Sequence, residues 1–198
     1  MNDTPLAGPS EVYILQCDVD HVARLTLDRL DDLDRLAPFD GMPLGASWEV
    51  LPMHWDTEGG RRPLADVSDL GHGGWAFSPR ALGALGDLLN GRGELLPLGI
   101  AGGVGGWQAF NVTRLSDALD EGHSRIEYFK GLAEILDIER YAFDPSRLVP
   151  ETVFKLRQDP APYEYVTDEF RRRVEQARLS GFLWDRRVWA VDARSGAA

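Results

Sequence analysis

The sequence predicts an α+β domain built mainly on antiparallel sheet, with a few helices packed against it. Short runs of β-forming residues recur along the whole chain, and only a few stretches have apolar residues at helical spacing. These strands and helices do not alternate in the regular rhythm of a parallel α/β fold. With 198 residues, of which 43% are hydrophobic, the chain is long enough to bury a sizeable core.

The first third of the chain predicts two strands separated by a helix. Residues 11–16 are rich in β-forming residues and predict the first strand. Four leucines spaced three residues apart predict a helix over residues 25–36, although the alternation of residues 25–27 also permits a strand at its start. Residues 46–55 predict the second strand.

The segment after the short strand of residues 75–77 predicts a capped helix. Ser78 is a preferred N-cap residue, and Pro79 suits the first helical position because its missing N–H is not needed there. Asn90 and Gly91 end the helix. Its predicted buried stripe consists of Leu82, Leu85 and Leu89.

A second helix is predicted to begin after Thr167, which can cap it. Asp168 and Glu169 fall in the first turn, where the helix dipole favours negative charge. Gly181 predicts a left-handed end, with Phe182 folding back onto the helix. The predicted buried stripe is Phe170, Val174 and Ala177.

The remaining strands are predicted from short β-forming runs. Residues 94–100 and 106–113 are expected to pair through the glycine-rich connection at 101–105. That connection matches no phosphate-binding motif, and a strand rather than a helix follows it. The other strand candidates are residues 140–143, 152–156 and 163–166.

The charge distribution divides the chain unevenly. The formal net charge is −11, and residues 1–72 carry 14 Asp and Glu against five Arg and no Lys, whereas residues 73–198 carry 18 acidic residues against 16 basic ones. We expect a loose N-terminal tail at 1–10, an acidic part at 11–72 and a core at 73–192, with the last two forming one continuous domain.

Composition also limits the partners and the compartment. An acidic chain repels phosphate backbones, so we expect no nucleic-acid partner, whereas a basic protein partner would be attracted. The single cysteine, Cys17, requires no oxidising compartment. The first residues lack the pattern of a secretory signal, and no apolar stretch is long enough to span a bilayer. A cytoplasmic protein without a membrane partner is the expectation.

Catalytic chemistry is nearly absent from the sequence. The four histidines are scattered, and the acidic turn that ends at His21 is expected to be a solvated turn rather than a metal site. Asp117, Asp120 and Glu121 form the best carboxylate cluster, but such residues more often cap a turn than act as acid and base. The sequence therefore predicts no catalytic residue, cofactor or metal. One or two of the six tryptophans are expected at the surface as interface anchors.

An ordered series of segments carries a resemblance to a known family. The chain resembles bacterial immunity proteins, first described as a domain of unknown function and typified by a myxobacterial member, whose genes lie beside those of polymorphic toxins. The resemblance covers about residues 65–190. It is carried by residues 75–85, 94–97, 111–113, 117–120, 153–156 and 166–182, together with Ser124.

The resemblance implies a protein that binds and neutralises a cognate toxin without catalysis. It transfers no functional residues, so the expected toxin-binding residues come from the acidic clusters: Asp28, Asp31, Asp32, Asp117, Asp120 and Glu121. Two alternatives remain open. One is a small hydrolase that uses Asp117, Asp120 and His123, and the other is a structural or self-associating module. The oligomeric state is not predicted.

Overall fold

The computed structural model describes residues 8–35, 39–71, 74–102 and 105–191, and it confirms the α+β class. In these residues most strand pairs are antiparallel. The α-helices are α1 (Pro79–Leu89), α2 (Pro145–Leu148) and α3 (Asp168–Gln176), and the short 3-10 helices are η1 (Leu30–Arg35) and η2 (Gly45–Ser47).

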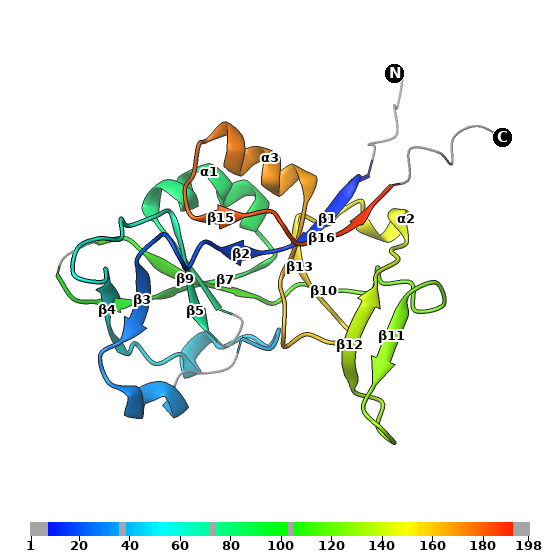
Figure 1. The fold of residues 1–198 in the computed structure, drawn as a ribbon, viewed down its shortest axis with the longest axis horizontal. Helices are drawn as coiled ribbons and strands as arrows, with labels where there is room; N and C mark the ends of the chain where they lie inside the picture. The colour runs from blue at the N-terminus through cyan, green and yellow to red at the C-terminus, as the bar shows by residue number, and fades with distance from the viewer. Residues whose placement is uncertain (1–7, 36–38, 72–73, 103–104, 192–198) are drawn as a thin grey trace.

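A five-stranded sheet joins the first strand to the second half of the chain. Its strands, in spatial order, are β10 (Leu115–Ser116), β13 (Val153–Leu156), β14 (Tyr165–Thr167), β1 (Glu11–Ile14) and β16 (Arg187–Ala190). Neighbouring strands are antiparallel except for β10 and β13. Because β1 lies between β14 and β16, segments far apart in the sequence lie side by side here (Figure 1).

The second large sheet has four antiparallel strands. Their spatial order is β5 (Val67–Gly71), β6 (Gly74–Phe77), β9 (Gln108–Val112) and β7 (Gly93–Pro97). The antiparallel pairing of β7 with β9 confirms the predicted pairing of residues 94–100 with 106–113. Only the beginning of the first range pairs in this way, however, because residues 99–100 form a strand of another sheet.

Three smaller sheets complete the fold. The first has the order β3 (Arg24–Leu27), β4 (Pro52–Asp56) and β8 (Gly99–Ile100), the second pairs β2 (Gln16–Cys17) with β15 (Phe182–Leu183), and the third is a hairpin of β11 (Arg125–Tyr128) and β12 (Ile135–Arg140). The hairpin projects from the body at the lower right of Figure 1, away from α1 and α3.

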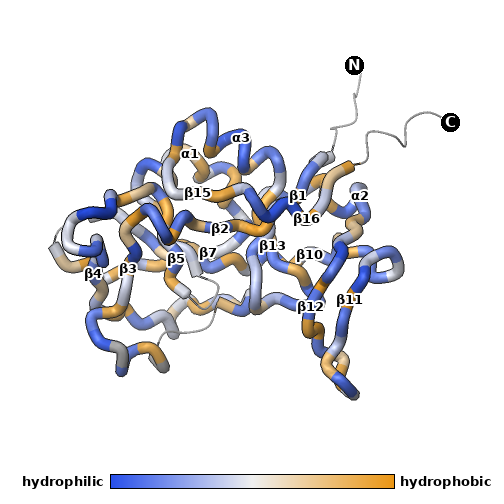
Figure 2. Tube along the Cα trace, viewed as in Figure 1, coloured by the Kyte–Doolittle hydropathy of each residue, from blue (hydrophilic) through white to orange (hydrophobic). Residues whose placement is uncertain are grey.

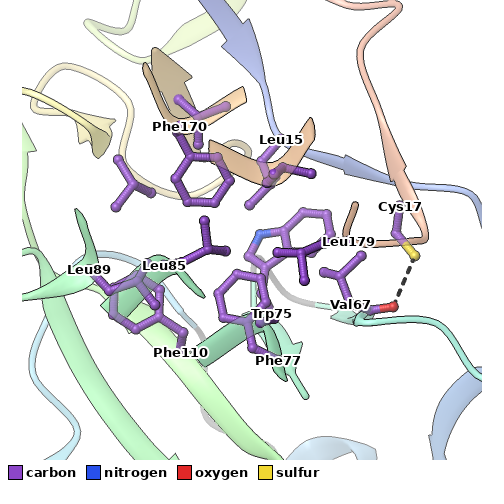
Figure 3. Close-up of a cluster of buried hydrophobic side chains, with 14 of the residues drawn as sticks. Leu15, Cys17, Val67, Trp75, Phe77, Leu85, Leu89, Phe110, Phe170 and Leu179 are labelled. Atoms are coloured by element: carbon purple, nitrogen blue, oxygen red, sulfur yellow. Dashed lines mark hydrogen bonds between the residues drawn. The ribbon is translucent and has the colours of Figure 1, made fainter. Parts of the chain in front are cut away.

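The largest core cluster lies between the two long helices and the sheets. Phe77 and Phe110 of the four-stranded sheet pack with Leu85 of α1 and Phe170 of α3, and each of these side chains is at most 2% exposed (Figure 3). Burying a side chain of this size contributes about 1.5–3 kcal/mol. One further cluster includes residues of β12, β13 and β14, and another includes residues of the sheet formed by β3, β4 and β8.

Local signals account for α1. Ser78 caps the helix as predicted, since its Oγ accepts the N–H of Ala81 at 3.0 Å, and Pro79 lies at the first position. Leu85 and Leu89 are buried and Leu82 is half-buried, which confirms the predicted stripe.

The predicted ends of α3 were partly wrong. Thr167 occupies the N-cap position, but its hydroxyl makes no capping hydrogen bond. The helix ends at Gln176, Ala177 is its C-cap and the next residue, Arg178, has a left-handed φ of 50°, so Gly181 is not the stop. Gly181 serves another purpose, because a Cβ there would lie 2.6 Å from the Cβ of Ala65.

The predicted helix over residues 25–36 was also wrong for its first turn. Residues 24–27 form β3, in which Leu25 pairs with Trp55 of β4, and η1 follows. Sheet pairing thus replaces the helix at the place where the alternation permitted a strand. The predicted strand at 46–55 begins only at Pro52, and the one at 140–143 is shifted, since β12 ends at Arg140.

Some predictions fall outside the described residues. These include residues 1–7 of the tail, the end of the predicted 25–36 helix and part of the glycine-rich connection. Within the tail that is described, Ser10 donates to Asp168 of α3 at 3.1 Å. The boundary between the acidic part and the core stays a prediction. Of the helices in the described ranges, none is both long enough and apolar enough to cross a membrane.

Candidate functional site

The first predicted cluster of contact residues lies between β3 and η1, and its members differ in exposure. Asp28 follows β3 and contacts His54 of β4, with 2.8 Å between Oδ1 and Nδ1. Asp31 is 87% exposed and lies 3.3 Å from the Arg29 guanidinium. Asp32 is only 6% exposed. Asp28 and Asp31 are therefore the members of this cluster that a partner can reach.

The second predicted cluster is brought together by the structure. Asp117, Asp120 and Glu121 line a surface pocket of about 360 Å³, together with Asp144 and Arg147. The Arg147 guanidinium lies 3.6 Å from Asp117, and Glu121 accepts a hydrogen bond of 3.0 Å from Gln158. This pocket is acidic, with one arginine among four carboxylates.

The Asp120–His123 pair explains the turn in this cluster. The two side chains are 2.7 Å apart, and the backbone N–H of His123 also donates to Asp120 at 3.2 Å. The side-chain hydrogen bond from His123 and its charge hold the pKa of Asp120 below its usual value. A general acid needs the opposite shift. Since His123 is 82% exposed as well, the geometry is that of a capped turn.

The acidic turn near His21 has a similar explanation. Asp18 Oδ1 lies 2.7 Å from His21 Nδ1, and the backbone N–H of His21 donates to the carbonyl of Asp18. In the described part of the chain, no group of three or more His, Cys, Asp or Glu side chains is arranged to hold a metal ion.

Two oppositely charged side chains form a buried pair inside the five-stranded sheet. Lys155 of β13 makes a salt bridge with Glu164, which precedes β14, and the two side chains are 0% and 2% exposed. Trp75 of β6 donates its Nε1–H to Glu164 at 2.8 Å. The pair therefore ties the two large sheets together. Lys155 and Glu164 thus have a structural role, which the sequence did not predict.

A pocket of about 320 Å³ lies beside this pair. Gln16, Cys17, Asp69 and Arg186 contribute to its lining. Burial raises the pKa of Cys17 to about 11, so its thiol stays protonated at neutral pH. The thiol also contacts the carbonyl of Val67 at 3.6 Å (Figure 3). Cys17 is thus suited to packing and not to nucleophilic chemistry.

The tryptophans do not supply the exposed anchors that the sequence led us to expect. Trp75 and Trp107 are buried, and the other four are half-buried. Trp48, for example, donates its Nε1–H to the carbonyl of Pro97 at 2.8 Å. Exposed apolar side chains gather instead on the β11–β12 hairpin: Tyr128, Phe129, Leu132 and Leu136 are 44–58% exposed.

The hairpin was not among the elements predicted from the sequence. Only Ser124 near its beginning and a strand at 140–143 near its end were named. The available signal was the pair of β-forming runs at residues 126–128 and 135–138, with Gly131 between them. Gly131 has a φ of 82°, in the left-handed region that glycine adopts readily in tight turns. Figure 2 shows the hairpin as a separate arm, on which hydrophilic and hydrophobic residues are interspersed.

Comparison with known proteins points to one family. Residues 107–187 match the model of an immunity protein family, Imm11. The match includes β9, the acidic turn, the β11–β12 hairpin and α3, and it confirms the resemblance to immunity proteins over these residues. It is shorter than the 65–190 range expected from the sequence. No curated protein is significantly similar to the chain.

Proposed function

We propose, from the match of residues 107–187 to an immunity protein family, that this chain binds and neutralises a cognate bacterial toxin in the cell that produces it. The match is the observation that carries the proposal. The protein acts by occlusion, covering a surface that the toxin needs, and makes or breaks no bonds itself. The proposed compartment is therefore the cytoplasm, and the proposed partner is a protein from a polymorphic toxin system.

The structure suits a protein that acts through its surface. A stable interface buries on the order of 1,600 Å² in total and needs an apolar centre with a polar rim. The body supplies a rigid platform through its two large sheets and their cores. Exposed acidic residues such as Asp28, Asp31 and Asp117, together with the net charge of −11, favour a basic toxin.

Co-expression with the toxin tests the proposal. The toxin domain encoded beside this gene is expressed in a host strain, with and without the chain. We expect growth only when the chain is present, and a stable complex of the two purified proteins. Continued killing in the presence of the folded chain, together with no complex by size-exclusion chromatography, would overturn the proposal.

A hydrolase is the second candidate, because Asp120 and His123 are in contact beside a pocket of about 360 Å³. The variant Asp120→Asn separates the two functions. A hydrolase would lose its turnover, whereas an immunity protein would keep most of its protection of the host, since Asp120 would be only one of several acidic residues that face the toxin.

A further inference from the structure

The β11–β12 hairpin is a two-stranded sheet that no further strand extends within the described residues. A two-stranded hairpin is only marginally stable by itself. This one is held by one face: Ile138 is buried, and Ile126 and Ile135 pack against the cluster that contains Phe143. The end of the hairpin that carries the turn extends beyond this contact.

The exposed apolar residues of the protein are concentrated at that end. Among the described residues eleven large apolar side chains are exposed, and four of them fall between residues 128 and 136. They are Tyr128 (44%), Phe129 (45%), Leu132 (58%) and Leu136 (49%). Single exposed apolar residues need no explanation, but a group of them on a projecting arm is typical of an interaction site.

Two like charges lie opposite each other in the hairpin and lower its stability. Glu127 of β11 pairs in register with Asp137 of β12, so two carboxylates lie opposite each other on adjacent strands. Like charges in this position destabilise a strand pair. In the described ranges, neither of them nor Glu134 in the turn has an ion-pair partner, whereas Glu139 at the base is paired with Arg125.

A cationic partner would remove this repulsion. Between residues 127 and 137 the charged side chains are Glu127, Lys130, Glu134 and Asp137, so the exposed end is acidic overall. A lysine or arginine placed between Glu127 and Asp137 would turn an unfavourable contact into a favourable one. The apolar side chains beside them would supply the dry centre that an interface needs.

We propose that the β11–β12 hairpin is the element that docks onto the toxin, with Phe129 and Leu132 entering an apolar recess and Glu127 and Asp137 pairing with basic residues around it. This inference rests on the proposed function and adds the site and the chemistry of the partner surface: apolar, with lysine or arginine at its edge.

A matched pair of variants tests the apolar contact. The tip variant Phe129→Ser/Leu132→Ser removes two residues that are 45% and 58% exposed. The control Met42→Ser/Leu64→Ser removes two that are 61% and 43% exposed elsewhere on the surface. We expect the tip variant to bind the purified toxin domain about 30-fold more weakly in calorimetry, and the control to bind within twofold of the wild type.

A second variant tests the charges and has a readout that needs no toxin. Glu127→Gln/Asp137→Asn removes the opposed carboxylates. We expect the melting temperature of the free protein to rise by about 1–3 °C, because a repulsion is lost. Association with the toxin should become slower and less dependent on salt. A fall in melting temperature together with an unchanged association rate would show that the carboxylates serve the fold and would overturn their role in docking.

The outcomes separate this inference from the proposed function. If the wild type binds the toxin and the folded tip variant binds it equally well, the hairpin inference is overturned and the function stands. If the wild type neither binds nor protects, both are overturned. A wild-type dimer in light scattering that the tip variant converts to a monomer would assign the hairpin to a second copy of the chain, which also overturns the inference.

Discussion

Charged residues differ between the body, meaning the two large sheets with α1 and α3, and the β11–β12 hairpin. In the body, Lys155 and Glu164 are almost fully buried but paired, and Glu151 is held by Arg92 and Arg114. In the hairpin, the opposed carboxylates at the exposed end have no cation beside them in the described residues. Burying an unpaired charge is costly, whereas an exposed one is tolerated. The body therefore uses its charges to hold the fold, and the hairpin leaves its charges available to a partner.

The largest expected effect comes from breaking the buried pair. Lys155→Met leaves the Glu164 carboxylate buried without its cation, and we expect the free energy of unfolding to fall by about 3–5 kcal/mol. Urea denaturation measures the loss. The double variant Lys155→Met/Glu164→Gln should recover much of it, because a neutral amide can still accept the Trp75 hydrogen bond. A single variant as stable as the wild type would refute the structural role of the pair.

A smaller loss is expected where the sheet leaves no space for a side chain. A Cβ at Gly93 of β7 would lie 2.0 Å from the carbonyl oxygen of Asn111, so Gly93→Ala should cost about 1–3 kcal/mol. The matched control is Gly86→Ala in α1, where a Cβ would meet nothing within 4 Å. That variant should gain up to about 1 kcal/mol, because alanine favours a helix more than glycine does. Thermal unfolding of both variants checks the contrast, and equal melting temperatures would contradict it.

Glu94 allows a test of pH dependence in the body. Burial of its carboxylate favours protonation, but the N–H groups of Leu44 and Gly45 and the amide of Asn111 outweigh it and lower the pKa. A lowered folded-state pKa gives stability that is present above the unfolded-state pKa of about 4.3 and lost as the pH falls through the folded value. Glu94→Gln should therefore cost about 1 kcal/mol at pH 7 and less below pH 4.

The control for Glu94 is Glu134→Gln, in the turn of the hairpin. Because this residue has no ion-pair partner in the described ranges, its replacement should change the free energy of unfolding by less than about 0.5 kcal/mol. Urea denaturation at pH 3.5 and pH 7 compares the two variants. A larger loss for Glu134→Gln than for Glu94→Gln would reverse the distinction between body and hairpin.

The smallest expected effect concerns the acidic residues near η1. Asp28→Lys/Asp31→Lys should slow toxin association about 2- to 10-fold and reduce its salt dependence. Stability should change little, because the contacts of these residues with His54 and Arg29 lie at the surface, where ion pairs contribute little. Stopped-flow measurements at several salt concentrations give the rates. Glu169→Lys/Asp185→Lys changes the net charge equally on exposed residues of the core part. Equal slowing by both variants would mean that overall charge, and not this cluster, steers the partner.

Short-range signals in the sequence were sufficient for several elements. The cap of α1 at Ser78, the stripe of α3 and the pairing of β7 with β9 follow from residues close together in the chain. The capping role of Asp120 could also be anticipated, because its partner His123 is three residues away. Each of these features depends on backbone geometry and side-chain chemistry that a few neighbouring residues determine.

Other features depended on segments distant in the sequence. The leucine spacing at residues 25–36 favoured a helix, but Leu25 and Leu27 pair with β4 because a buried sheet position stabilises them more than helix propensity does. The burial of Lys155 required Glu164 beside it, and Glu164 in turn accepts a hydrogen bond from Trp75 of the other large sheet. Which end of the hairpin stays exposed likewise depends on the packing of its base against Phe143 and its neighbours.

The sequence by itself determined the α+β class, the acidic character of the chain, the capped helix α1, the buried stripe of α3 and the resemblance to immunity proteins. Only the tertiary structure decided which charges are paired, which apolar side chains stay exposed and where the hairpin projects. The physical reason is that caps and periodicity act over a few residues, whereas burial and ion pairing are fixed by neighbours that the folded chain brings from far away.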